Sequence, residues 1–220
     1  MIVLICMSYA ILWFFPQTSY LTYGYASTDL YWIWLTGMLI VFIPLMYSRM
    51  PKEAEDGLYD VWRSRGIAWM DILLFKFFAG FSLSMILMGL TLPHLAVVSA
   101  ISEGTSFQLL ELVIGIIGSI LLMTIFCVIS LIVSAFTSNT ALMVLLAMLL
   151  SLIMHQGISW ISELPFWSAT LSYEINRYSL STVIAVWGIG LVSLTSILYV
   201  VSLIGFGFFI AHSLWSSKSA

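Results

Sequence analysis

Long apolar stretches separated by short polar segments run the length of this chain. A helix needs about 20 apolar residues to cross the roughly 30 Å hydrocarbon core of a bilayer. The stretches show no alternation of polar and apolar positions, which favours helices over the strands of a membrane barrel. Five stretches contain no Asp, Glu, Lys or Arg: residues 1–28, 30–48, 77–102, 112–162 and 178–217.

Polar and turn-forming residues divide these stretches further. Pro16, Pro51, the segment 102–106 and the segment 137–140 are the main interruptions. Pro93 lies late in an apolar run, where a kink is favoured over a break because neighbouring helices can satisfy the freed backbone groups. The pattern predicts a single domain, residues 1–220, with six membrane-spanning helices over about 1–15, 30–48, 74–98, 110–136, 140–161 and 183–211.

The connection between the second and third predicted spans, residues 49–73, is charged and too long for a turn. Within it, Leu58, Val61 and Trp62 fall at positions i, i+3 and i+4, which is one apolar stripe of a helix. Asp60 and Arg63 take other faces, and glycines at both ends suit its start and stop. We predict a short amphipathic helix over about 57–66 at the membrane surface; a solvated loop helix without a partner is the alternative.

The connection before the last span, residues 162–182, combines aromatic residues with Pro165 and a few charges. Tyr and Trp are enriched where membrane meets water. We predict short re-entrant or interfacial helices here, with an ordinary aromatic-rich loop as the alternative.

Composition narrows the class of protein. The chain is 62% hydrophobic and 8% charged, with a mean hydropathy of +1.11, whereas soluble domains average roughly 45–50% apolar and about 25% charged residues. So few charges cannot cover 220 residues with a solvated surface. A soluble enzyme, a disordered chain and a nucleic-acid binder are excluded, and the fold class is an all-α integral membrane protein.

The basic residues set the predicted orientation, because cytoplasmic loops carry an excess of Lys and Arg. The connection after the second span would therefore be cytoplasmic, and six spans then place both termini there. The other side receives Asp29, Glu103, Glu163, Glu174 and a single basic residue, Arg177. Five of the seven basic residues lie in or next to the connection between the second and third spans: Arg49, Lys52, Arg63, Arg65 and Lys76.

Motifs for catalysis or nucleotide binding are absent from the sequence. No lysine follows a glycine, so the phosphate-binding G-x-x-x-x-G-K-[ST] pattern does not occur, and H-E-x-x-H, G-x-S-x-G and G-x-G-x-x-G are missing too. We therefore predict that the chain is not an enzyme and holds no cofactor or metal. Cys6 and Cys127 lie in apolar runs, where buried structural thiols are favoured over ligands or redox partners.

Three scattered histidines and two other ionisable residues have no assigned role. His155 is the strongest polar candidate, because an ionisable residue within a span usually faces the bundle interior. A satisfied interior histidine is favoured over a proton relay or a haem ligand. The others are His94, His212, Glu111 and Arg177.

The charged connection and its neighbours resemble the type-2 ATP-binding-cassette (ABC) transporter permeases, in particular the gliding-motility-like branch. The likeness extends over nearly the whole chain, through segments such as Leu90-Thr91-Leu92-Pro93 and 130–139. Arg65-Gly66 stands where that family usually has Ser/Thr-Pro. The matching positions in the connection are Glu53, Gly57, Asp60, Ile67, Asp71, Ile72, Leu74, Lys76 and Phe77.

The resemblance implies a permease subunit of an ATP-driven transporter, most simply an exporter, in a bacterial plasma (inner) membrane. Two six-span protomers, identical or related, would form the path in the lipid bilayer. Separate ATPase subunits would bind ATP and Mg, with further accessory subunits and no nucleic acid. A non-catalytic structural or assembly subunit of another membrane complex is the alternative, and a membrane-embedded enzyme ranks third. The implied ATPase-coupling residues are Glu53, Gly57, Leu58, Asp60, Val61, Trp62 and Arg63.

Overall fold

The computed structural model describes residues 28–101, 109–188 and 191–217, and within these ranges it contains helices and no strands. The predicted first span, about 1–15, lies outside them. The helices are α3 (Thr28–Tyr47), α4 (Met50–Glu55), α5 (Leu58–Ser64), α6 (Trp69–Ile101), α7 (Leu109–Ser134), α8 (Thr140–Ser162), α9 (Ala169–Asn176), α10 (Leu180–Gly188) and α11 (Leu194–Ser217).

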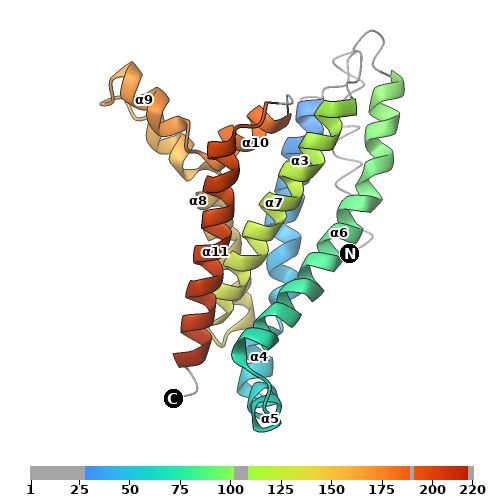
Figure 1. The fold of residues 1–220 in the computed structure, drawn as a ribbon, viewed down its shortest axis with the longest axis vertical. Coiled ribbons are helices and arrows are strands. Elements are labelled where there is room, and N and C mark those ends of the chain that lie inside the picture. The colour runs from blue at the N-terminus through green and yellow to red at the C-terminus, as the bar shows by residue number, and fades with distance from the viewer. Residues whose placement is uncertain (1–27, 102–108, 189–190, 218–220) are drawn as a thin grey trace.

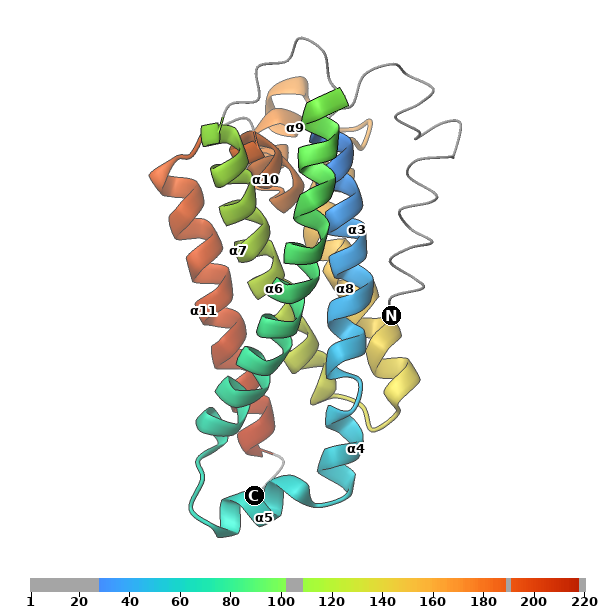
Figure 2. The same cartoon turned by 90° about the vertical axis from the view of Figure 1, so that its right-hand side faces the viewer.

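Four of the described helices are long and apolar enough to cross a membrane. Their spans are Trp69–Pro93, Val113–Ser134, Thr140–Ser162 and Leu194–Ser217. Together with α3 they form an elongated bundle whose long helices run roughly side by side (Figures 1 and 2). The protein is therefore a multi-pass, membrane-embedded, all-helical protein.

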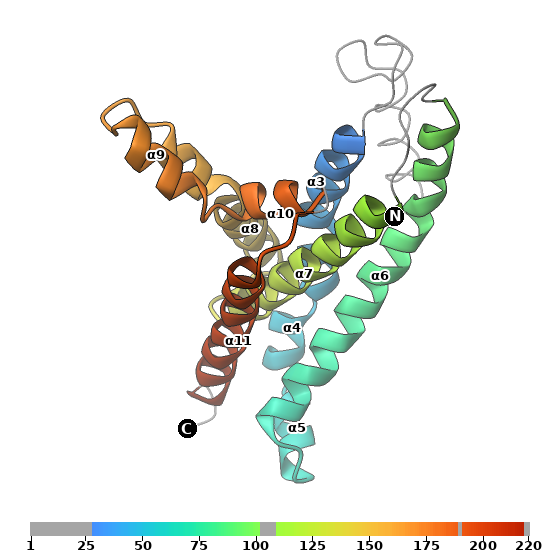
Figure 3. The same cartoon turned by 45° about the horizontal axis from the view of Figure 1, so that its top comes forward.

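The bundle has two distinct ends. We call the end that carries α4, α5 and the end of α11 the α5 end, and the opposite end, with α9 and α10, the α9 end (Figure 1). At the α9 end, α9 folds back toward α8: Trp167 Nε1 donates to the Ile161 carbonyl at 2.8 Å, and Ser172 Oγ donates to the Ser162 carbonyl at 2.5 Å. The α8–α9 corner projects away from the bundle (Figure 3).

Helix α7 is the centre of the bundle. It contacts α3, α6, α8, α10 and α11, and its residues Leu122, Met123, Phe126, Cys127 and Leu131 are at most 1% exposed. A helix that is hydrophobic on all sides is buried by its neighbours. The run without charges around Cys127 thus forms the core, and Cys127 is a buried free thiol, as the sequence predicted.

Small residues bring the other helices close to α7. A Cβ added at Gly207 of α11 would collide with Val128, and one added at Gly118 would lie 3.3 Å from the Trp187 ring of α10. Glycine at these contacts lets helix backbones approach closely, which is a common basis of helix packing in membranes.

Several buried hydroxyls in the long helices are satisfied within their own helix, whereas the buried Ser151 hydroxyl of α8 has no hydrogen-bond partner among the described residues. Ser84, Ser119 and Ser130 each donate at 2.9 Å to the carbonyl four residues earlier. Internal pairing of this kind is required where water is excluded.

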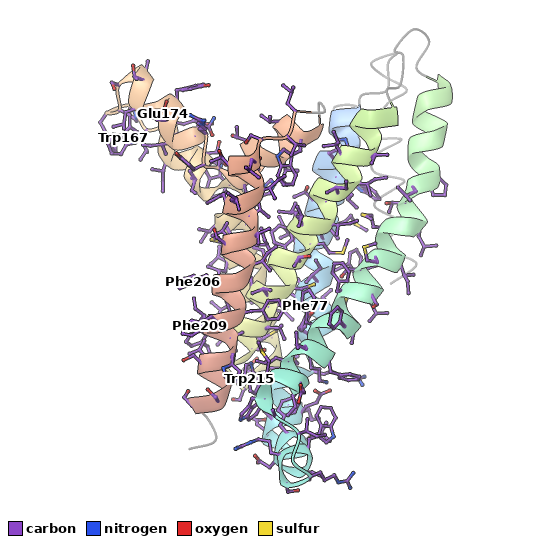
Figure 4. All side chains as sticks on the ribbon, in the orientation of Figure 1. Phe77, Trp167, Glu174, Phe206, Phe209 and Trp215 are labelled. Carbon is purple, nitrogen blue, oxygen red and sulfur yellow. The ribbon has the colours of Figure 1, made fainter. Side chains whose placement is uncertain are left out.

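The outward faces of the helices are apolar. On α11, Leu194, Leu198, Phe206 and Phe209 are all more than 60% exposed, and Figure 4 shows Phe206 and Phe209 pointing away from the bundle. In a water-soluble protein such a surface would aggregate. In a bilayer these side chains contact lipid.

Two predicted boundaries differ from the structure. The single span expected over about 183–211 is divided into α10, which ends at Gly188, and α11. Ser193 caps the start of α11: its Oγ accepts from the Ser196 N–H at 3.1 Å. The connection 49–73 holds a second short helix, α4, which the sequence analysis missed. Helix α6 continues through Pro93, so this proline does not break it.

Candidate functional site

The α5 end carries the sequence-predicted site. Helices α4 and α5 leave the end of α3 and return to α6 as two short helices that contact each other, below the long helices in Figure 1. Pro51 lies in the first turn of α4, where its missing N–H costs nothing.

Two glycines fix the ends of α5. Gly57 and Gly66 have φ angles of 72° and 84°, in the left-handed region that residues with a Cβ avoid. The chain can therefore turn sharply on each side of Leu58–Ser64. The helix predicted between these glycines is present, one turn shorter than the range of about 57–66.

Glu53 connects three helices. Its Oε2 accepts a hydrogen bond from the Tyr59 hydroxyl of α5 at 2.7 Å and one from Lys76 Nζ of α6 at 2.5 Å. Burial raises the pKa of Glu53, but the hydrogen bonds from Lys76 and Tyr59 and the charges of Lys76 and Arg49 outweigh it, so the pKa lies below its ordinary value. The carboxylate thus stays charged and holds α4, α5 and α6 together.

Tyr59 is the most deeply buried residue of α5 and packs on the bundle. It is 2% exposed, and its ring meets Trp215 of α11 edge-on at 5.4 Å and Trp69 of α6 at 5.9 Å. Burial, followed by the hydrogen bond and charge of Glu53, raises its pKa, so the hydroxyl stays protonated and donates. Trp215 Nε1 in turn donates to the Leu131 carbonyl of α7 at 3.1 Å.

These contacts make one continuous cluster, which we call the Tyr59 cluster: Glu53, Tyr59, Trp69, Lys76 and Trp215. Figure 4 shows Trp215 at the lower end of α11, next to α5. Edge-on aromatic pairs contribute about 0.5–1.5 kcal/mol beyond the area they bury. The cluster thus connects α5 to α6 and α11, and through Trp215 to α7.

The opposite face of α5 is open. Leu58 and Val61 are 36% and 49% exposed, and Asp60 and Arg63 beside them are exposed too. Arg63 lies over the Trp69 ring, 5.5 Å from its centroid. Arg63 is thus on the Tyr59 side of α5, and the open face presents two apolar side chains and the Asp60 carboxylate.

Trp62 differs from its predicted partners on the apolar stripe. It is half-buried, and its ring contacts Phe75 edge-on at 6.2 Å and Tyr59 at 5.9 Å. Leu58 and Val61 of the predicted stripe are exposed, whereas Phe75 and Lys76 of α6 cover one side of Trp62.

A cleft lies beside α5, between it, α4, the α7–α8 turn and α11. Its volume is about 230 Å³. Glu55, Asp60 and Ser138 are polar residues in its lining, and Tyr59 and Trp215 are aromatic ones. Asp60 belongs to both the lining of the cleft and the exposed face of α5, so the two adjoin.

The structure brings most of the predicted site residues to this end but divides them into two groups. One group is exposed: Leu58, Asp60, Val61 and Arg63. Glu53, in contrast, forms hydrogen bonds with Tyr59 and Lys76 of the same chain. Sequence analysis missed Tyr59, because it is adjacent to Leu58 and off the apolar stripe, and Trp215, because it is distant in the sequence. The one sequence feature that could have indicated these residues was Lys76, a charged residue directly before a long charge-free stretch.

The remaining ionisable residues lie elsewhere. His155 is 8% exposed in α8, and Arg177 at the α9 end is exposed, 3.9 Å from Glu174. The side chains of Glu111 and His94 lie outside the described residues, and His212 is half-buried on α11. No group of three or more His, Cys, Asp or Glu side chains gathers within the described residues to hold a metal ion.

Comparison with known proteins gives no identity: no family model, curated protein or solved structure matches this chain.

Proposed function

We propose that this protein is the permease subunit of an ATP-driven ABC transporter, in which α5 contacts a separate ATPase subunit. The observation that carries the proposal is the two-sided character of α5. One side offers Leu58 and Val61 to a partner, and the other is fixed through Tyr59 to α6 and α11. A helix that only closed a loop would need no such connection.

The exposed side suits a helix-in-groove contact. Such contacts use a few apolar anchors rimmed by charge, and the exposed Leu58 and Val61 with the Asp60 carboxylate nearby have this composition. The Tyr59 cluster gives the contact a route to the long helices. Nucleotide-driven movement of an ATPase would shift α5 and, with it, α6 and α11.

The proposed arrangement has six spans, the α5 end in the cytoplasm and a bacterial inner-membrane location. Its support is that five basic residues gather on or beside α4 and α5 and near the start of α6: Arg49, Lys52, Arg63, Arg65 and Lys76. Helix α6 keeps a broad apolar face exposed, which leaves room for a second protomer to complete a path. The resemblance to type-2 ABC permeases supports both points.

Site-specific photo-crosslinking tests the proposal. A benzophenone amino acid at position 61, in the full chain in native membranes, should attach to a protein that carries a P-loop. The same probe at position 209, on the lipid-exposed face of α11, is the matched control and should not. Cross-linking to a protein without nucleotide-binding motifs would favour the alternative, an assembly subunit of another complex.

A double variant then tests coupling. Leu58→Asp with Val61→Asp should weaken ATPase binding by about thirtyfold or more, because losing central anchors commonly costs at least about 2 kcal/mol. Leu171→Asp on α9, which is also exposed, should leave ATPase binding and hydrolysis unchanged. Unaltered binding in the α5 double variant would contradict the proposal.

A further inference from the structure

A further cavity, at the α9 end, lies between the end of α9, helix α10 and the start of α11 (Figure 1). Its volume is about 400 Å³, within the range of roughly 300–1,000 Å³ found for small-molecule sites. We call it the Arg177 pocket, after the charged residue among the described residues that line it. Around Arg177 the lining contains the aromatic Tyr178 and Tyr199 and apolar side chains that include Val186 and Leu191.

The length of α11 places this pocket at the level of the lipid headgroups. The helix has 24 residues, which at a rise of 1.5 Å per residue is about 36 Å, slightly more than the roughly 30 Å thickness of the hydrocarbon core. Its first two turns, which bring Ser196 and Tyr199 to the pocket, therefore lie at the boundary between hydrocarbon and headgroups. The charges of Glu174 and Arg177 agree with this depth, because charged side chains avoid the core of the bilayer.

Side-chain contacts hold the walls of the pocket in place. The Tyr199 hydroxyl of α11 donates to the Tyr178 carbonyl at 3.0 Å, and the two rings meet edge-on with centroids 6.2 Å apart. Trp187 of α10 is 1% exposed, and its Nε1 donates to Ser196 Oγ at 2.9 Å. These contacts fix α10 and α11 to the residue next to Arg177, so the pocket is formed before any ligand arrives.

Arg177 offers donors that the described part of the chain does not use. Its nearest ionic partner there is Glu174, whose Oε2 lies 3.9 Å from Nη1, beyond hydrogen-bond distance. Both side chains are exposed. Every other described Lys or Arg lies on or beside α4 and α5 or near the start of α6. The planar guanidinium matches the geometry of a phosphate, to which it can donate two parallel hydrogen bonds.

The pocket also has an apolar side that is open to lipid. Val186, Leu191 and Val192 line it and are exposed. Leu194 and Leu198 on the lipid-facing side of α11 are exposed as well and adjoin the lining residues in the sequence. One molecule with a phosphate and an acyl chain can therefore contact Arg177 and these side chains together.

We propose that the Arg177 pocket binds a membrane phospholipid through its phosphate group. The guanidinium of Arg177 donates hydrogen bonds to the phosphate oxygens, and the first part of one acyl chain lies against Val186 and Leu191. Because the phosphate is the group that is recognised, phosphatidylglycerol and phosphatidylethanolamine should bind alike. This binding requires neither ATP nor an ATPase, so it stands apart from the proposed transport function.

Photolabelling of the full chain in dodecyl maltoside micelles, a detergent without phosphate, tests the site. The probe is a phosphatidylglycerol with a diazirine near the ester end of one acyl chain. After irradiation, peptide mapping should find more label on Val186 and Leu191 than on Phe206 and Phe209, which are exposed further along α11 and lie outside the pocket. Equal labelling of the two pairs would mean ordinary surrounding lipid and would overturn the site.

Two variants of neighbouring charged residues test the phosphate contact. Arg177→Gln removes the guanidinium from an exposed position and should lower the pocket label by about fivefold or more, as expected when a charge-assisted hydrogen bond is lost. Glu174→Gln is the matched control. It removes the other member of the exposed pair and should leave the label unchanged or raise it, because a carboxylate repels a phosphate. Equal labelling of Arg177→Gln and the unaltered chain would overturn the role of Arg177.

Competition tests the phosphate without altering the chain, so it does not depend on the folding of a variant. Unlabelled phosphatidylglycerol and phosphatidylethanolamine should displace the probe, whereas diacylglycerol, which has the same acyl esters but no phosphate, should not. Equal displacement by diacylglycerol would overturn phosphate recognition. Inorganic phosphate alone should leave the label in place. If it displaced the probe as well as the phospholipids do, the pocket would be a site for free phosphate and the lipid would be the wrong ligand.

Discussion

Glu53 shows how one carboxylate can organise an end of a membrane protein. It lies on a helix of six residues, which is too short to be stable alone. Its hydrogen bonds to Tyr59 and Lys76 connect that helix to α5 and α6. Its side chain and that of Lys76 are only 26% and 17% exposed, so solvent screens their attraction less than at a free surface.

The depressed pKa of Glu53 makes stability depend on pH. Because the folded pKa lies below the unfolded one, the stabilisation is complete above the unfolded value, about 4.3, and is lost as the pH falls through the folded value. Detergent-solubilised protein should therefore unfold more readily below about pH 4, and Glu53→Gln should show less of this dependence. Glu55→Gln, an exposed neighbour on α4, is the control. Identical pH profiles for the three proteins, measured by thermal unfolding, would contradict the role of Glu53.

At the scale of elements, α5 is defined by its boundaries as much as by its own residues. The helix has only seven residues, and its position follows from the two left-handed glycines that flank it and from Tyr59 beneath it. This arrangement leaves Leu58 and Val61 facing outward. The element can therefore present a surface while it stays connected to the long helices.

Gly57→Ala should loosen α5. A Cβ in the left-handed region costs about 1–2 kcal/mol, so the midpoint of unfolding should fall and exposure of Tyr59 should increase, as seen by tyrosine-directed labelling. Gly89→Ala in α6 is the matched control, because its Cβ meets nothing within 4 Å and its backbone is helical. There the better helix propensity of alanine should leave stability unchanged or slightly higher. An equal loss in both variants would show that the φ angle of Gly57 is not the cause.

At the scale of the molecule, the bundle has chemically different ends. Arg49, Lys52, Arg63 and Arg65 lie on or beside α4 and α5 at the α5 end, whereas the α9 end carries Glu163, Glu174 and aromatic side chains such as Trp167 (Figure 4). Between the ends, the outward faces are apolar. An asymmetry of basic residues sets the orientation of multi-pass proteins, so we expect a single orientation.

Cysteine labelling in intact cells measures that orientation. In a Cys6→Ser background, where Cys127 is buried, a cysteine at Ser64 of α5 should resist an impermeant maleimide until the membrane is opened. A cysteine at Thr170 of α9 should react at once. Both positions are exposed, so burial would not explain a difference. Reaction of the cysteine at position 64 from outside would reverse the proposed topology.

The sequence by itself determined the class of this protein and most of its elements. Within the described residues, four helices formed by these runs are long and apolar enough to cross a membrane, because a helix satisfies its own backbone in lipid. The helix between Gly57 and Gly66 followed from a local pattern: the i, i+3, i+4 spacing of its apolar residues and its glycine ends. The buried thiol of Cys127 followed from its apolar surroundings. The ATPase contact and the orientation are still predictions.

The tertiary structure alone decided which face of each helix is buried and which is exposed. All faces of these spans are apolar, so the sequence carried no periodicity to separate the core face of α7 from the lipid face of α11. Tyr59 and Trp215 meet across more than 150 positions of chain, and only the packing of α5 against α11 joins them. The packing of α5 against α6 covers Trp62 and leaves Leu58 and Val61 exposed, and the meeting of α3, α7, α8 and α10 surrounds His155 with a pocket. Local patterns reveal helices, but contacts between distant helices depend on how side chains fit in three dimensions.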